Sequence, residues 1–280
     1  MKLSSKSLYI VSTPIGNLED ITLRAIDTLK NSDIILCEDT RHSMRLLNHF
    51  KIKKKIISYH KFNEKKELIR IIKYLNDGKI LSLISDAGTP ALSDPGRLLI
   101  QTCIDKGINI IPVPGVSSIV SAMSVSGFKD QFFFYGFLPK TENEVKKTLL
   151  SLSELTCSLV FFIPAKKINF YLKRFKTFFL GRKILIAKEI TKLHETFYRE
   201  NLDQIKLFKT PIKGELTVVI SEKKIKDKFF DENKIIKKAK LYLKKYTLKD
   251  VVELLFESEK ISKKKIYQIC LNLKKNEKNN

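Results

Sequence analysis

The sequence predicts an α/β protein with two α/β domains, a parallel sheet in the first and a mixed sheet in the second, followed by a small helical C-terminal extension. Up to about residue 115, short β-branched runs alternate with amphipathic segments of helix length, the pattern of a parallel α/β sheet. Aromatic and aliphatic strands separated by helices follow. After Ser221 the chain is rich in lysine and contains neither glycine nor proline. We therefore expect domains at 1–117, 118–222 and 223–280.

The strands and helices of the two α/β domains follow from these patterns. In the first domain the predicted strands are 8–11, 33–37, 55–58, 80–84 and 109–113, with helices such as 21–30 and 64–76. In the second domain the predicted strands are 132–137, 158–163, 183–187 and 216–220, with helices near 142–153 and 165–179.

The C-terminal extension has the pattern of three helices. They are expected at about 233–245, 248–257 and 263–274, with Ser262 as the N-cap of the last one. The last two helices are joined by a short turn. They are compatible with a helix-turn-helix that contacts nucleic acid, and equally with an appendage that packs on the rest of the protein.

The chain is strongly basic. Its 53 lysines and arginines exceed its 30 acids and give a net charge of +23, of which +9 falls within 221–280. Such a charge indicates a polyanionic partner, either nucleic acid or an anionic membrane surface. Only 8 of the 53 basic residues are arginine, so a general composition bias toward lysine is a second explanation.

Several classes of protein are disfavoured by the sequence. Apolar runs such as 132–134 and 159–163 are far shorter than the roughly 20 residues of a membrane-spanning helix, and the N-terminus has no signal-peptide pattern. The four cysteines stand far apart without a CxxC pair, which disfavours a zinc cluster or a disulfide framework and favours a reducing compartment. We expect a cytoplasmic protein without a metal site.

Chemically unusual residues follow most strands of the first domain. In open parallel sheets, ligands bind at the carboxyl ends of the strands. The first strand leads into a turn with Pro14 and Gly16, where proline fixes φ and glycine allows a close backbone approach. No GxGxxG and no P-loop sequence is present, which disfavours the usual dinucleotide-binding and Rossmann-type methyltransferase sites.

The segment 85–96 is the most informative loop. Asp86 follows a buried strand directly and is predicted to contact a ligand, with a small-residue loop behind it. Asp94 precedes Pro95, a pattern that predicts Asp94 as the N-cap of a helix whose first residue is Pro95. Ser117 and Ser118 begin another helix, where they suit a polar ligand or a simple cap equally well.

Two further loops concentrate polar side chains. Residues 38–42 place two acids, a hydroxyl, a guanidinium and an imidazole at one strand end, which is more typical of a site than of a solvated turn. His60 follows the next strand and is a candidate for the same cleft. The segment 188–192 follows a second-domain strand and is compatible with a site or a solvated turn.

Taken in chain order, the motifs resemble one family closely. They are Leu8 to Leu18, Glu38 to His42, Ser85 to Pro90, Asp94 to Gly96, Val113 to Gly115, Gly136 to Pro139 and Lys188 to Lys192. This series is similar to the 2′-O-ribose methyltransferase I family of small-subunit ribosomal RNA, within the tetrapyrrole methylase superfamily.

The resemblance implies S-adenosyl-L-methionine (AdoMet) bound between two α/β domains, a homodimer, and methylation of the ribose 2′-hydroxyl of a cytidine in the decoding region of small-subunit (16S) rRNA. Carried over by position, the cofactor site would use eight residues: Pro14, Gly16, Asp86, Gly88, Thr89, Ser117, Ser118 and Phe162. The segment Gly214 to Thr217 would also contribute to it. The catalytic candidates are Glu38, Asp39, Arg41 and Glu189, and the substrate-binding candidates are His42, His60, Lys188 and Lys192.

The sequence departs from the family at 161–167. Family members generally carry a Glu and a His near the places of Ile163 and Lys166. Either these two positions have no essential acid-base role, or the activity of this chain is reduced. Two alternatives stay open: a superfamily relative that methylates a small tetrapyrrole, and a non-enzymatic RNA-binding ribosome assembly factor.

Overall fold

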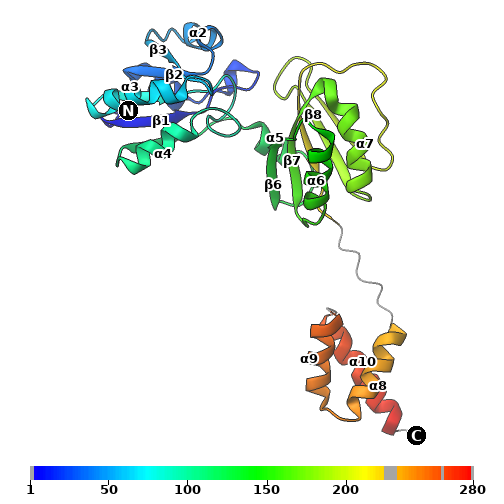
Figure 1. Ribbon diagram of the computed structural model, residues 1–280. Helices are drawn as coiled ribbons and strands as arrows, with labels where there is room; N and C mark the ends of the chain where they lie inside the picture. Colours follow the sequence, from blue (N-terminus) through cyan, green and yellow to red (C-terminus); the bar gives the residue numbers. More distant parts are fainter. Residues whose placement is uncertain (1–2, 224–231, 260–261, 279–280) are drawn as a thin grey trace. The chain divides into compact units, whose positions relative to one another are not determined.

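The computed structural model describes residues 3–223, 232–259 and 262–278. The chain divides into two compact units, Met1–Lys224 and Ile225–Asn280 (Figure 1). The first unit contains both sheets and the second contains three helices. The domain boundaries predicted at 117 and 222 stay predictions.

The first sheet is parallel throughout. Its five strands, in the spatial order β3-β2-β4-β1-β5, are β1 (Ser7–Val11), β2 (Ile34–Cys37), β3 (Lys55–Ser58), β4 (Ile80–Leu83) and β5 (Asn109–Val113). The connecting helices are η1 (Leu18–Asp20), α1 (Leu23–Asn31), α2 (Thr40–His49), α3 (Glu64–Asn76) and α4 (Arg97–Asp105).

Helices cover both faces of this sheet. Leu8 of β1 packs with residues of α3 and α4, whereas the adjacent Tyr9 packs with residues of α1 and α2. Successive side chains of a strand point to opposite faces, so both faces must be apolar when both are covered. Every β2 residue is accordingly buried.

The second sheet is mixed. Its spatial order is β6-β7-β10-β8-β9, where β6 and β7 are parallel and the other pairs are antiparallel. The strands are β6 (Phe132–Phe137), β7 (Ser158–Pro164), β8 (Lys183–Lys188), β9 (Thr196–Asn201) and β10 (Glu215–Ile220). The helices around it are α5 (Ser118–Ser124), α6 (Glu142–Ser153), η2 (Ala165–Lys167) and α7 (Ile168–Phe178).

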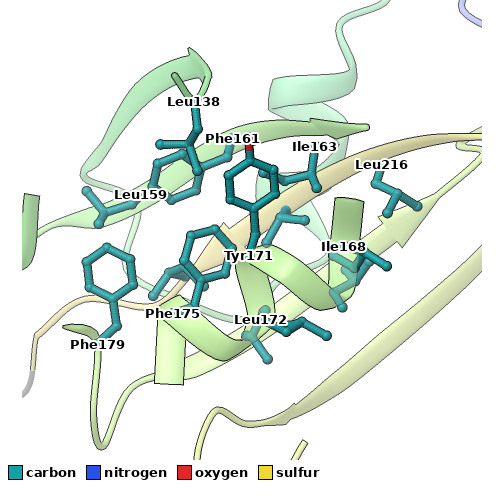
Figure 2. Packing of buried hydrophobic residues seen from close by; sticks show 14 of the residues in the cluster. Leu138, Leu159, Phe161, Ile163, Ile168, Tyr171, Leu172, Phe175, Phe179 and Leu216 are labelled. Atoms are coloured by element: carbon teal, nitrogen blue, oxygen red, sulfur yellow. The ribbon is translucent and has the colours of Figure 1, made fainter. Parts of the chain in front are cut away.

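The core of the second sheet is aromatic. Phe161 of β7 stacks on Phe175 of α7 with ring centroids 5.4 Å apart, and Tyr171 and Phe179 extend the cluster (Figure 2). On the other face, Ile119 and other apolar residues of α5 pack against the sheet, together with Ile15 from the loop after β1. The first domain's loop therefore reaches the second sheet.

The C-terminal unit has an apolar core of its own. It consists of α8 (Glu232–Leu243), α9 (Leu248–Glu259) and α10 (Lys263–Lys278), whose buried residues include Ile235, Leu255 and Ile266. Part of the predicted turn before Ser262, residues 260–261, lies outside the described residues. None of the helices within the described ranges is long and apolar enough to cross a membrane.

The predicted fold class is confirmed: a parallel α/β sheet, a mixed α/β sheet and C-terminal helices. The strand β9 was not predicted; it is an edge strand whose residues Thr196–Asn201 are half-buried or exposed. Its two aromatic residues, Phe197 and Tyr198, are adjacent and are followed by three polar residues, so the segment lacks the alternation that predicts a strand. β9 pairs in full register with β8, from Lys183 opposite Asn201 to Lys188 opposite Thr196.

Candidate active site

Two adjoining cavities lie where the loops of the first sheet meet the second sheet. The first has a volume of about 380 Å³ and the second about 540 Å³. Both are lined by Ile15, Asp86, Ala87 and Glu215. These four residues therefore form a shared wall, and ligands held in the two cavities would be neighbours.

The first cavity combines apolar rings with hydroxyls and carboxyls. Phe137 and Phe162 contribute apolar surface, and their ring centroids are 5.3 Å apart. The polar part of the lining comes from loops of the first domain and from the start of α5: Asp86, Thr89, Asp94, Ser117 and Ser118. Ser117 precedes α5 without making a side-chain cap hydrogen bond, so its hydroxyl is not used in capping.

The loops after β1 and β4 are bonded to each other. Thr13 N donates to Gly88 O at 2.9 Å, and Gly88 N donates to Thr13 O at 3.0 Å. The Ser12 and Thr89 hydroxyls are 2.9 Å apart. Gly88 has a φ of +77°, a conformation that L side chains rarely adopt. These contacts fix the backbone that lines the first cavity.

Asp94 does not cap a helix, so the N-cap prediction was wrong. Helix α4 begins at Arg97, after Gly96 with a φ of +136°. Ala91 and Ser93 also have positive φ values, +66° and +71°. With these backbone conformations the loop places Asp94 in the lining of the first cavity. Burial, with a smaller effect of the Glu38 charge, raises the pKa of Asp94 to about 6.

An acidic group gathers beside the shared wall at the ends of β2 and β4. Asp86 Oδ1 accepts a hydrogen bond of 3.2 Å from Asp39 N. Burial raises the pKa of Glu38, the Asp86 charge raises it further, and His60 acts in the opposite direction. The Asp39 carboxylate instead caps α2 and accepts from Arg41 N at 2.8 Å and His42 N at 3.4 Å, which lowers its pKa.

The second cavity is more basic. Besides the shared wall, its lining includes Pro14 and Gly16 from the loop after β1, His42 and Arg45 from α2, and Lys192. The two loops that meet here are close, because Asn17 N donates to Thr191 Oγ1 at 3.1 Å. A Cβ added at Gly16 would lie 2.7 Å from the same hydroxyl. The close contact between the loop after β1 and the segment 188–192 therefore requires glycine at position 16.

Ion pairs of Lys192 hold the segment 188–192 against the start of β10. Lys192 Nζ lies 3.0 Å from Glu189 Oε1 and 3.0 Å from Glu215 Oε2. Glu189 Oε1 also accepts from Glu215 N at 2.8 Å. Burial alone would raise the pKa of Glu189, but these hydrogen bonds and the Lys192 charge lower it overall. The Glu189 carboxylate is therefore occupied in fixing the start of β10.

Ten of the sixteen predicted site residues line one of the two cavities. Gly88, Thr89, Ser117, Ser118 and Phe162 line the first, Pro14, Gly16, His42 and Lys192 line the second, and Asp86 lines both. Six line neither: Glu38, Asp39, Arg41, His60, Lys188 and Glu189. The Arg41 side chain is 94% exposed. His60 Nδ1 accepts a hydrogen bond from Phe62 N at 3.2 Å. His60 lies near enough to the acidic group to lower the pKa of Glu38.

Two charged lining residues, Asp94 and Arg45, were not among the predicted site residues. The Asp-Pro sequence is a familiar helix start, which favoured a cap at Asp94, and Arg45 lies three residues beyond the polar segment 38–42. The spacing of His42 and Arg45, which puts them on one helix face, was the available signal. At the departure from the family pattern, Ile163 is buried in the core beside the first cavity and Lys166 is exposed.

Comparison with known proteins identifies relatives over most of the chain. A family model described as Tetrapyrrole (Corrin/Porphyrin) Methylases matches residues 7–206. A "Ribosomal RNA small subunit methyltransferase I" of Mesomycoplasma conjunctivae is 44% identical over 239 residues, covering 84% of this chain and 96% of the relative. One from Rickettsia prowazekii is 42% identical over 268 residues, covering 94% and 95%.

Solved structures share the fold at low sequence identity. The methyltransferase CobJ gives a TM-score of 0.59 at 15% identity, covering 77% of this chain and 93% of CobJ. Uroporphyrin-III C-methyltransferase from Thermus thermophilus, complexed with S-adenosylhomocysteine, gives 0.53 at 15% identity, covering 77% and 97%.

Proposed function

The chain belongs to the family of the tetrapyrrole (corrin/porphyrin) methylases, and we propose that it transfers a methyl group from AdoMet to the ribose 2′-hydroxyl of a cytidine in the decoding region of small-subunit rRNA. Its relatives at 42–44% identity indicate a methyltransferase of small-subunit rRNA. The ordered series of strand-end motifs supports the 2′-hydroxyl of cytidine as the acceptor.

The residues of the first cavity fit AdoMet, and this fit is the observation that carries the proposal. When bound, AdoMet supplies a methyl group on a positively charged sulfur. Phe137 and Phe162 offer apolar surface for a purine ring, and Ser117 and Ser118 offer hydroxyls to polar groups. The carboxyls of Asp86 and Asp94 suit a cationic ligand, because opposite charges attract strongly where water is partly excluded.

Glu38 is the best-supported proton acceptor among the three acids considered. The Asp39 carboxylate is used in capping α2 and the Glu189 carboxylate in binding Lys192 and Glu215 N. The pKa of Glu38 is raised instead of lowered, and a higher pKa makes a stronger base. A base of this kind contributes about 10²–10⁴-fold to the rate.

The acceptor nucleotide would be held by the loop of residues 38–42 and the segment 188–192. His42 and Lys192 line the second cavity, while His60 and Lys188 are assigned to the same nucleotide as outer contacts. Holding the ribose hydroxyl in line with the methyl group supplies much of the rate, because it removes the entropy cost of alignment. The proposal includes a homodimer acting on RNA in the cytoplasm.

The proposal is tested by titrating the full-length protein with AdoMet in a calorimeter and then measuring transfer of labelled methyl groups to small ribosomal subunits. We expect saturable binding and label in the rRNA. Binding without transfer to rRNA would contradict the assigned substrate and favour a tetrapyrrole acceptor. Absence of AdoMet binding would favour a non-enzymatic assembly factor.

A further inference from the structure

The positive charge in the lining of the second cavity is not explained by AdoMet binding. Its three cationic or ionisable nitrogen side chains are His42, Arg45 and Lys192. The first cavity is lined by three carboxyls, Asp86, Asp94 and Glu215, and, among the described residues, by no cationic side chain. The second cavity shares Asp86 and Glu215 but adds these three nitrogen side chains. A ligand with an anionic group fits it better.

Arg45 is the permanently charged, uncommitted cation of this set. Lys192 is neutralised by Glu189 and Glu215, each 3.0 Å from its Nζ. Arg45 is exposed and makes no ion pair or side-chain hydrogen bond within the parts of the chain that the structure describes.

The helix that carries Arg45 is firmly anchored. Its neighbours Leu46 and Leu47 are 9% and 0% exposed, and Asp39 caps the first turn of α2. The backbone under Arg45 is therefore fixed while the guanidinium is free. A guanidinium of this kind binds phosphate oxygens through two parallel hydrogen bonds, which lysine cannot do.

We propose that the second cavity is the subsite for the acceptor nucleotide and that Arg45 binds a phosphate of that nucleotide. This inference rests on the proposed function and adds a residue and a ligand group to it. The shared wall of Ile15, Asp86, Ala87 and Glu215 places the nucleotide next to the cofactor cavity. Arg45 would act as a positioning residue through the RNA backbone.

The test compares four full-length proteins: wild type, Arg45→Gln, Arg45→Lys and Arg24→Gln. Arg24 is an exposed arginine of α1 that lines neither cavity, so its variant controls for the loss of one surface charge. The probes are a short single-stranded oligoribonucleotide, whose binding is measured over a range of salt concentrations, and small ribosomal subunits. AdoMet affinity, measured by calorimetry, shows that each variant is folded.

We expect Arg45→Gln to weaken oligoribonucleotide binding about ten- to hundredfold, the loss of one charge-assisted contact. The slope of log affinity against log salt should fall by about 0.7, the value for one phosphate of a single strand. The KM for subunits should rise with little change in kcat, AdoMet affinity should stay within about twofold, and Arg45→Lys should recover part of the binding.

Equal salt slopes and KM values for Arg45→Gln and Arg24→Gln would overturn the subsite. If Arg45→Gln also lost AdoMet binding, the decision would rest on Arg45→Lys. Oligoribonucleotide binding and a KM for subunits equal to those of the wild type in Arg45→Lys would then overturn the subsite as well. Failure of the proposed function has a different signature, because the wild type would then transfer no label to subunits. The oligoribonucleotide measurement would still decide whether Arg45 binds phosphate.

Discussion

At the scale of single residues, Asp94 is a carboxyl that its loop holds in the lining of the first cavity. The loop that carries it has left-handed backbone at Ala91 and Ser93. Such conformations cost energy in non-glycine residues and persist where the surrounding structure enforces them. The Asp94 carboxyl is partly removed from water, and the negative charges of Glu38 and Asp86 lie close to it. Both effects raise its pKa.

The raised pKa of Asp94 predicts a pH-dependent cost in stability. Because the folded-state pKa of about 6 lies above the ordinary 3.8, the folded protein binds the proton more tightly than the unfolded chain, and stability falls as the pH rises between these values. Asp94→Asn removes this effect. We expect the variant to gain about 1–2 kcal/mol over the wild type at neutral pH and nothing near pH ~4.

Urea unfolding of the wild type and Asp94→Asn at the two pH values measures this difference. A gain of the same size at both values would contradict a raised pKa and indicate a packing effect. The wild type serves as its own control, since the same carboxyl is largely protonated in the acid sample.

Glu38→Gln tests the proton acceptor. The substitution keeps the size of the side chain and removes its basicity, so we expect methyl transfer to fall about 10²–10⁴-fold with AdoMet affinity unchanged. Glu67→Gln, which changes an acid of α3 paired with Arg70, is the matched control and should keep the wild-type rate. A wild-type rate for Glu38→Gln would remove Glu38 from the chemistry.

At the scale of elements, the loop from β4 to α4 determines the shape of the first cavity. Gly96 is the point where this loop packs closely on the core. A Cβ added there would lie 2.8 Å from Leu83 Cδ2 and 3.3 Å from Ala91 Cβ. Leu83 is only 2% exposed, so it has little room to move. The loop and the sheet beneath it are therefore packed as one piece.

Gly96→Ala is expected to destabilise the protein by about 2–4 kcal/mol, from overpacking and an unfavourable φ together. AdoMet affinity should fall as well, because the segment carrying Asp94 is displaced. Gly107→Ala is the matched control: Gly107 has a φ of +63° but nothing within 4 Å of an added Cβ, so about 1 kcal/mol is expected. Denaturant unfolding and calorimetry give the two quantities, and equal losses for the two variants would contradict the packing argument.

Elements with a strong local pattern were predictable from the sequence, and elements fixed by tertiary contacts were not. The strand Lys55–Ser58 and the helix Glu64–Asn76 match their predicted bounds, because β-branched runs and amphipathic periodicity are local signals. β9 exists because it pairs with β8, and Asp94 lines the cavity because the backbone turns through positive φ values at Ala91, Ser93 and Gly96. Neither cause is visible in a short stretch of sequence.

At the scale of the whole molecule, the charge is unevenly divided. Residues 221–280 carry +9 of the net +23 in about a fifth of the length. The described helices of this segment form a core that shares no residue with the cores of the two sheets. Lys238 and Lys263 pair with acids of α9. Exposed lysines such as Lys240, Lys244 and Lys245 are expected to contact phosphates.

Deleting residues 225–280 should weaken binding to small subunits and reduce its salt dependence, because several phosphate contacts are lost. AdoMet affinity should be unchanged, since the lining of both cavities lies within the first unit. Filter binding at several salt concentrations and calorimetry measure the two effects. Unchanged subunit binding would attribute the lysine excess to composition alone.

The central claim is transfer of a methyl group to a ribose 2′-hydroxyl of small-subunit rRNA. Mapping 2′-O-methylation across that rRNA, in subunits incubated with AdoMet and with or without this protein, tests it most directly. We predict one new modified ribose, on a cytidine of the decoding region, that disappears with Glu38→Gln. A methyl group on a base, on a protein or on no component of the subunit would contradict the account.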